Sequence, residues 1–214
     1  MNNRAFALMP LLLLASGCAM MNSPAGTVSR EQAVAAESWR SVATPADRER
    51  IRGWWDAWQA ALTGARAAGH SAQITAEGAL LDPMAALPNA HVPPGDYECR
   101  VIKLGAAARG NLAFVAYPRF RCRVEAEQDI FSFAKLTGSQ RPVGLIFSDT
   151  ERRKIFLGTL ALGDEARALD YGTDPQRDLA GIVERIGTNR WRIVFPRPAF
   201  ESIVDVIELV PVSE

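Results

Sequence analysis

The sequence predicts a mainly β (α+β) fold, with an amino-terminal helix packed on an approximately eight-stranded antiparallel β-barrel or barrel-like sheet. Two observations support this fold class. From Gly95 onward, short apolar or alternating runs follow one another and are separated by Gly, Asn, Asp and Pro, which is typical of antiparallel barrels and sandwiches. Before residue 95, one long stretch places apolar residues three and four positions apart, which is the period of a helix.

The first 17 residues are expected to be a signal peptide. Arg4 gives a basic start, and the apolar run at 5–15 is too short to cross a bilayer, which needs ~20 apolar residues. The run ends in Ala15-Ser-Gly-Cys18, which resembles the lipobox of bacterial lipoprotein precursors. The resemblance implies cleavage before Cys18, lipidation of its thiol, and a lipid anchor at the periplasmic face of the outer membrane. A secreted periplasmic form is the alternative, because Ala15 departs from the usual Leu, Val or Ile.

The remaining chain is divided into a tether, a helical segment and a β-domain. Residues 18–43 are expected to form a lipid-anchored tether, residues 44–94 a helical segment and linker, and residues 95–214 an antiparallel β-domain that forms one folding unit with 44–94. Thr44 caps a helix that should end near Gly69. Its apolar stripe is expected to pack on the rest of the domain and consists of Ile51, Trp54, Trp55, Trp58, Leu62 and Ala65.

Eight strands are expected in the β-domain because eight short runs have strand-like patterns bounded by turn residues. The segment 179–186 also has apolar residues at helical spacing, so strand and helix both stay open there. The expected strands lie at about 96–105, 111–124, 129–137, 142–148, 154–162, 179–186, 190–196 and 202–210.

Cys99 and Cys122 are predicted to form a disulfide, because an even pair of cysteines is usually bridged in an oxidising compartment. A two-residue turn at Gly110-Asn111 would pair the flanking strands in a register that places the two cysteines directly opposite each other. Pro118 lacks the backbone donor that this register needs, so a bulge or an edge position is expected there.

Composition and motifs argue against several function classes. The chain has 24 basic and 24 acidic residues, so the basic excess that nucleic-acid binding needs is missing. The spacing of its cysteines and histidines does not fit a metal site, and no cofactor motif or catalytic set is recognised. His70 and His91 are expected to be idle. Ser132 and Lys135 match the S-x-x-K pattern, but on a strand they would point to opposite faces.

Basic and polar side chains form the candidate binding sites. Arg119, Arg121 and Arg123 share one face of a strand and could bind phosphate or carboxylate groups of an anionic envelope component. The alternative is an ordinary hydrated outer face of the sheet. Gln140 and Arg141 lie in a polar loop at 137–142, which could serve as a recognition loop at the mouth of a barrel.

Five segments carry a family resemblance: RVIKLG (100–105), FVAYPRF (114–120), KLTGSQRPVGL (135–145), FLGTLALGDE (156–165) and ESIVDVIELVP (201–211). Together they resemble the uncharacterised proteobacterial family called domain of unknown function 4893, over roughly residues 40–211. The resemblance implies one continuous domain and supplies no catalytic residues.

These observations favour an envelope lipoprotein that acts as a non-enzymatic binding or accessory module of the periplasm. Its expected partners are the membrane, through the lipid anchor, and an envelope protein or an anionic envelope component. One alternative is a carrier of small apolar ligands with an open barrel interior, because such pockets are concave and mostly apolar. A second alternative is a hydrolase with an unrecognised polar site.

Overall fold

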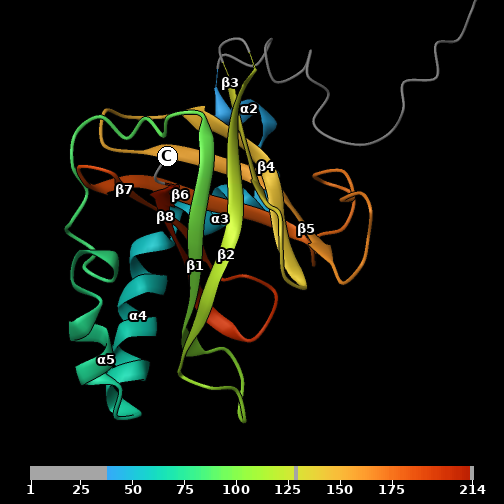
Figure 1. Ribbon diagram of the computed structural model, residues 1–214. Coiled ribbons are helices and arrows are strands. Elements are labelled where there is room, and N and C mark those ends of the chain that lie inside the picture. The colour runs from blue at the N-terminus through green and yellow to red at the C-terminus, as the bar shows by residue number, and fades with distance from the viewer. Residues whose placement is uncertain (1–37, 128–129, 213–214) are drawn as a thin grey trace, which may run out of the picture.

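The computed structural model describes residues 38–127 and 130–212. Within these residues, eight antiparallel strands form one closed barrel, in which each strand pairs with its sequence neighbours and β8 pairs with β1 (Figure 1). The strands are β1 Gly95–Ala106, β2 Phe114–Glu127, β3 Ile130–Lys135, β4 Gln140–Ser148, β5 Lys154–Leu162, β6 Asp178–Gly187, β7 Arg190–Pro196 and β8 Ser202–Pro211. The predicted barrel is confirmed, and the segment 179–186 is a strand.

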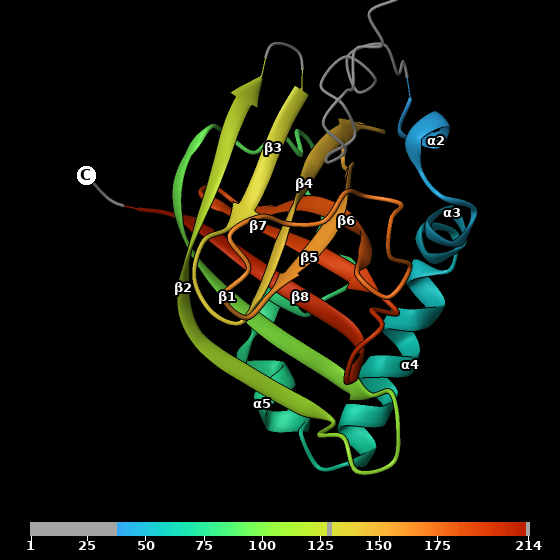
Figure 2. The same ribbon diagram turned by 90° about the vertical axis from the view of Figure 1, so that its right-hand side faces the viewer.

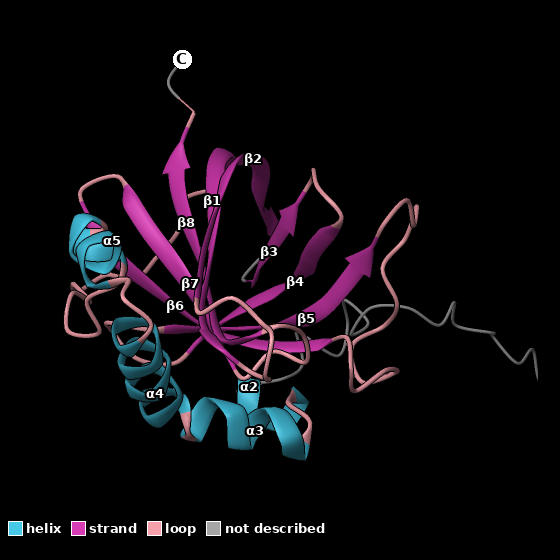
Figure 3. Cartoon of the chain, turned by 90° about the horizontal axis from the view of Figure 1, so that it is seen from below, coloured by secondary structure: helices cyan, strands magenta, loops and turns pink. Residues whose placement is uncertain are grey.

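The helices lie along one side of the barrel, as Figure 2 shows. They are α2 Trp39–Val42, α3 Pro45–Arg52, α4 Trp54–Ala67, α5 Ser71–Ala76 and the 3₁₀ helix η1 Gly78–Leu80. The single helix expected at 45–68 is therefore interrupted at Gly53, a residue type at which helices often bend. The bend lets α3 pack on β6 while α4 packs on β1, β7 and β8, so the helical segment follows the curved wall of the barrel (Figure 3).

Small residues bring α4 close to the barrel. Ala57, Ala61 and Ala65 are fully buried, and a Cβ placed on Gly105 of β1 would lie 2.7 Å from the Cα of Ala61. The predicted apolar stripe is correct for most of its members but wrong for Trp55, which is 39% exposed. Ala65 belongs to the predicted stripe, whereas Ala57 and Ala61 lie outside it, and Ala61 makes the close approach to Gly105.

A buried ion pair holds η1 against the outer wall. Arg192 of β7 and Glu184 of β6 are fully buried, and the Arg192 Nη2–Glu184 Oε2 distance is 2.6 Å. Nη1 of Arg192 also donates hydrogen bonds to the carbonyl oxygens of Ala79, Leu80 and Asp82. The guanidinium therefore satisfies carbonyl groups at the end of the helical segment that would otherwise be buried without partners.

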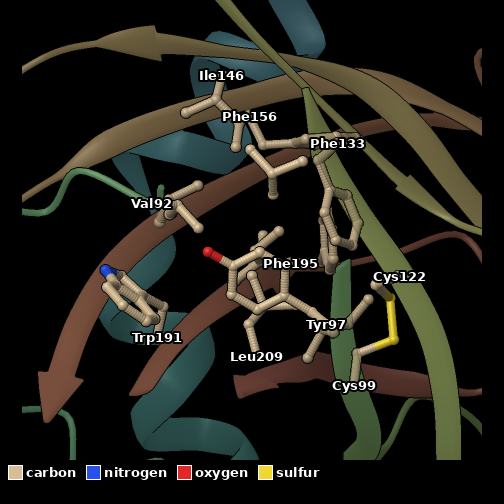
Figure 4. Close-up of a cluster of buried hydrophobic side chains, with 14 of the residues drawn as sticks. Val92, Tyr97, Cys99, Cys122, Phe133, Ile146, Phe156, Trp191, Phe195 and Leu209 are labelled. Atoms are coloured by element: carbon tan, nitrogen blue, oxygen red, sulfur yellow. A yellow bond between two sulfur atoms is a disulfide. The ribbon is translucent and has the colours of Figure 1, made fainter. Parts of the chain in front are cut away.

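Aromatic side chains fill the inside of the barrel (Figure 4). The Phe156 ring makes edge-to-face contacts with Phe133 and Phe195, with centroid distances of 5.9 and 5.4 Å. Gly144 and Gly158 are paired across β4 and β5, and a Cβ on either would lie within 2.7 Å of the tip of the Phe156 ring. The two glycines leave the space that the ring occupies, which is how a small barrel reaches a packed interior.

The linker at 88–94 closes one end of the barrel. Val92 is buried in the interior cluster, the Trp191 indole N–H donates to the carbonyl of His91 at 2.8 Å, and the Tyr97 hydroxyl donates to the carbonyl of Pro93 at 2.6 Å. Burial raises the pKa of Tyr97 to about 12. The consecutive prolines thus form a plug held by side-chain hydrogen bonds.

Residues 38–43, which were assigned to the tether, pack on the barrel. Trp39 of α2 is buried with Ile155 and Phe147, and its indole N–H donates to Asp149 Oδ1 at 2.8 Å. The predicted signal peptide at 1–17, Cys18 and the rest of the tether lie outside the described residues. None of the helices in the described part of the chain is long and apolar enough to cross a membrane.

The predicted Cys99–Cys122 disulfide is confirmed, with a Cα–Cα distance of 5.9 Å. The predicted register is wrong, because Cys99 pairs with Phe120 and Cys122 pairs with Tyr97, so the cysteines are diagonal neighbours. Residues 107–113 form a longer connection than the expected two-residue turn. The register shifts between Arg100 and Ile102, opposite the segment that contains Pro118, so the expected bulge at this proline is confirmed.

We expect the double substitution Cys99→Ala/Cys122→Ala to lower the free energy of unfolding by about 3 kcal/mol, because the bridge closes a 23-residue separation in the unfolded chain. Urea unfolding followed by tryptophan fluorescence measures the difference. Reduced wild-type protein should match the variant. Equal stability of the oxidised wild type and the variant would contradict the prediction.

Candidate binding site at the open barrel mouth

A cavity of about 320 Å³ opens at the barrel end opposite the linker plug. The turn between β3 and β4 and the connections at 163–177 and 197–201 surround it. Part of its floor belongs to the packed interior cluster, so the cavity is the unfilled upper part of the same core. Its main apolar lining residues are Val101, Phe120, Leu160, Leu179, Phe195 and Ile207.

One side of the mouth carries a paired lysine. Lys103 Nζ lies 2.9 Å from Asp205 Oδ2 and 3.2 Å from Glu201 Oε2, and the Ser202 hydroxyl hydrogen-bonds to Asp205. Burial alone lowers the pKa of Lys103, but the two carboxylates outweigh it and raise the pKa above its usual value. Burial raises the pKa of Asp205 against the opposing effect of Lys103. The charge of Lys103 is therefore compensated within the protein by two carboxylates.

A second lysine, Lys135, lies in a different environment. Its ammonium group donates to the carbonyl oxygens of Thr137 at 2.7 Å and Gln140 at 3.0 Å, and it lies 3.6 Å from the centroid of the Phe120 ring. All three contacts are with neutral groups. Burial, with repulsion from Arg141 and Lys103, lowers the pKa of Lys135 to about 8. Such a displaced pKa inside a cavity marks a candidate functional residue.

The predicted loop residues have different roles. Gln140 and Arg141 lie at the start of β4 and not in a loop, because the strand begins earlier than expected, and Gln140 lines the cavity. Arg141 instead donates to the carbonyl oxygens of Gly138, Gly163 and Glu165. Its guanidinium therefore ties the β3–β4 turn to the connection after β5 and shapes the rim.

The predicted arginine row lies on the outside of the barrel, away from the cavity. Arg119, Arg121 and Arg123 alternate with the inward-facing Phe120 and Cys122, as the strand pattern predicted. Acidic residues of β1 face the row. Arg123 pairs with Asp96 at 2.7 Å and Arg119 with Glu98 at 3.6 Å, and Glu98 is also the cross-strand neighbour of Arg121. Interleaved charges make this face less attractive to an anion than the sequence suggested.

Neither histidine lines the cavity, and of the S-x-x-K pair only Lys135 does. His70 stacks on Phe114, and His91 lies edge-on to Phe131 in the linker plug. On β3, Lys135 points inward and lines the cavity, whereas Ser132 belongs to the opposite face of the strand. Among the described residues, no group of His, Cys, Asp and Glu side chains could hold a metal ion.

Sequence reasoning missed Lys103, Lys135 and Asp205 as site residues. All three occupy inward positions in strands whose other inward residues are apolar, for example Phe133 before Lys135 and Ile207 after Asp205. A charged residue that replaces an apolar one in a period-two pattern is the signal that could have indicated the site.

Taken together, the fold and the site define a closed antiparallel barrel with one plugged end and one open, ligand-sized mouth. The chain belongs to the family described as domain of unknown function (DUF4893), which matches residues 39–209 and therefore includes both the helices and the barrel. No curated protein and no solved structure matches the chain. The function must therefore be argued from the cavity itself.

We expect Asp205→Asn to destabilise the protein by about 3 kcal/mol, because removing one partner of a buried ion pair leaves the other charge poorly compensated. The double variant Lys103→Met/Asp205→Leu removes both charges and should recover most of that loss. Urea unfolding of the two variants and the wild type measures both effects. A double variant that is less stable than Asp205→Asn would refute this interpretation of the pair.

Proposed function

We propose that this chain is an envelope lipoprotein whose barrel acts as a non-enzymatic module that binds a small, largely apolar ligand at its open mouth. The observation that carries the proposal is the cavity of about 320 Å³, which lies at the low end of the ~300–1,000 Å³ range of small-molecule sites. Its walls are mostly aromatic and aliphatic. A few polar groups at the rim could fix the orientation of a ligand.

The filled lower half of the barrel limits what can bind. Phe133, Phe156 and Phe195 occupy the centre of the interior, and the linker plug covers the far end. A ligand could therefore enter only from the mouth and would occupy only the upper part of the barrel. This arrangement favours a compact ligand over one that threads through the barrel.

The lipoprotein part of the proposal rests on Cys18 and the segment before it. Residues 19–37 would link the lipid anchor to α2, where the family match begins at residue 39. A link of about 19 residues can span tens of ångströms when extended. The barrel could then reach ligands near the periplasmic face of the outer membrane.

We expect the full chain to enhance the fluorescence of 1-N-phenylnaphthylamine, an uncharged apolar probe, in a saturable manner. Val101→Trp places a large side chain in the cavity wall and should weaken probe binding at least tenfold. Val143→Trp is the matched control, because Val143 lies between the inward-facing positions of β4 and does not line the cavity. Equal probe binding by the two folded variants would contradict a ligand site at the mouth.

We expect Cys18→Ser to abolish incorporation of labelled palmitate and to release the protein from the membrane fraction. Mass spectrometry of the native protein should find an acylated amino terminus at Cys18. The double variant Cys99→Ser/Cys122→Ser changes the other two cysteines and should still be labelled. Unlabelled wild-type protein with an intact leader would refute lipidation.

A further inference from the structure

The cavity contains one buried lysine, Lys135, whose ammonium group contacts no carboxylate among the described residues. Lys135 is only 4% exposed, and its ammonium contacts two carbonyl oxygens and an aromatic ring. No ion pair joins it to a carboxylate anywhere in residues 38–127 and 130–212. A buried charge without a counter-charge is costly to maintain, so its position in an accessible cavity calls for an explanation.

Lys103 provides an internal comparison within the same mouth. It is equally buried, but Asp205 and Glu201 both lie within ion-pair distance of it. The protein can therefore supply carboxylates to a lysine in this cavity, and it does so for one lysine and not for the other. The pKa of Lys103 is raised, whereas the pKa of Lys135 is lowered to about 8. This difference between the two lysines is expected if the cavity binds an external anion beside Lys135.

The local packing keeps the Lys135 ammonium at the cavity wall. Gly138 in the β3–β4 turn has φ +88°, and a Cβ there would lie 2.7 Å from Lys135 Nζ and 2.9 Å from the Phe120 ring. Thr137 and Gln140, on either side of this glycine, hold the ammonium through their carbonyl oxygens. The turn therefore fixes the position of the charge without enclosing it, because Lys135, Gly138 and Gln140 all line the cavity.

We propose that the cavity binds a small amphipathic monocarboxylate, whose carboxylate pairs with Lys135 and whose apolar chain lies on Phe120, Leu160 and the interior cluster. This inference rests on the proposed function and names its ligand class. One ammonium group without a carboxylate partner matches a ligand with one negative charge better than it matches a dianionic phosphate, which the nearby carboxylates Glu201 and Asp205 would repel more strongly. The remaining apolar surface suits a hydrocarbon chain, which binds by burial of its surface.

The size of the cavity limits the length of that chain. A volume of about 320 Å³ corresponds to roughly ten water molecules at ~30 Å³ each, and a methylene group is of similar size. Carboxylates with about eight to twelve carbons should therefore fit best. Decanoate is a suitable probe, and decan-1-ol is its uncharged counterpart of equal length.

Isothermal titration calorimetry of the full chain at pH 7 tests the inference. The wild type should bind decanoate at least tenfold more tightly than decan-1-ol. Lys135→Met keeps an unbranched side chain but removes the charge, so it should weaken decanoate binding at least tenfold and leave decan-1-ol binding unchanged or stronger. Lys154→Met is the matched control, because Lys154 hydrogen-bonds to Ser148 and does not line the cavity, and it should bind both ligands like the wild type.

A pH series on the wild type tests the same inference without a substitution. The pKa of Lys135 without a ligand is about 8, so its amine is mostly protonated below that pH and mostly neutral above it. Decanoate affinity should therefore fall as the pH rises from 7 to 9.5. Decan-1-ol affinity should stay constant. The other ionisable side chains that line the cavity are Lys103, Tyr117, Glu201 and Asp205, and Arg141 also repels the ammonium. Lys103 stays charged across this range, since its two carboxylate partners raise its pKa.

The outcomes separate the two proposals. Equal binding of decanoate and decan-1-ol by the wild type, with no effect of Lys135→Met, would overturn the carboxylate inference and leave the ligand site standing. A wild type that binds neither ligand, nor the naphthylamine probe, would overturn both. If Lys135→Met does not fold, the pH series decides: a flat decanoate affinity between pH 7 and 9.5 would overturn the inference.

Discussion

The pairing of β8 with β1 is the constraint on which the rest of this structure depends. It closes the sheet, so each strand has two partners and every second residue must be accommodated in one enclosed interior. An eight-stranded barrel is just wide enough for its own side chains to fill it. Phe156 fills the centre because Gly144 and Gly158 leave room for its ring. Around Leu160 and Leu179 the inward-facing side chains do not fill the interior completely, and the remaining space is the cavity.

Closure also explains why inward-facing charges matter more here than on an open sheet. A lysine on the outer face of a barrel is hydrated at little cost, whereas an inward-facing lysine must find partners inside the protein or in a ligand. Lys103 finds Asp205, which belongs to β8 and lies opposite it only because the barrel is closed. Lys135 lies on β3, which is not part of that closing pair of strands, and its hydrogen-bond partners are backbone carbonyls of the β3–β4 turn. The two lysines differ in their partners because they lie on different strands.

Local patterns predicted the strands and the irregularity at Pro118, because each depends on neighbouring residues. The disulfide partners followed from the count of cysteines, since Cys99 and Cys122 are the pair left besides Cys18. The hairpin register could not be predicted in the same way. The observed register differs from the expected one because the connection at 107–113 is longer than a two-residue turn and because the bulge changes the pairing. Local sequence rules do not predict how these two effects combine. The break at Gly53 depends on the curvature of the wall beneath α3 and α4. An open interior stayed an alternative, but Lys135 could not be identified as a site residue, because its partner Phe120 lies on the neighbouring strand β2 and not near it in the sequence.

The disulfide stabilises the part of the barrel that forms the proposed site. In the sheet register Cys99 pairs with Phe120 and Cys122 pairs with Lys135, so the bridge lies directly beside the ring and the ammonium that form one wall of the cavity. A covalent link at this point holds β1 and β2 together next to the bulge, where the ladder of hydrogen bonds is disrupted. The wall that positions Lys135 is therefore most secure when the cysteines are oxidised. With the cysteines reduced, the chain would carry the same side chains but a less rigid mouth.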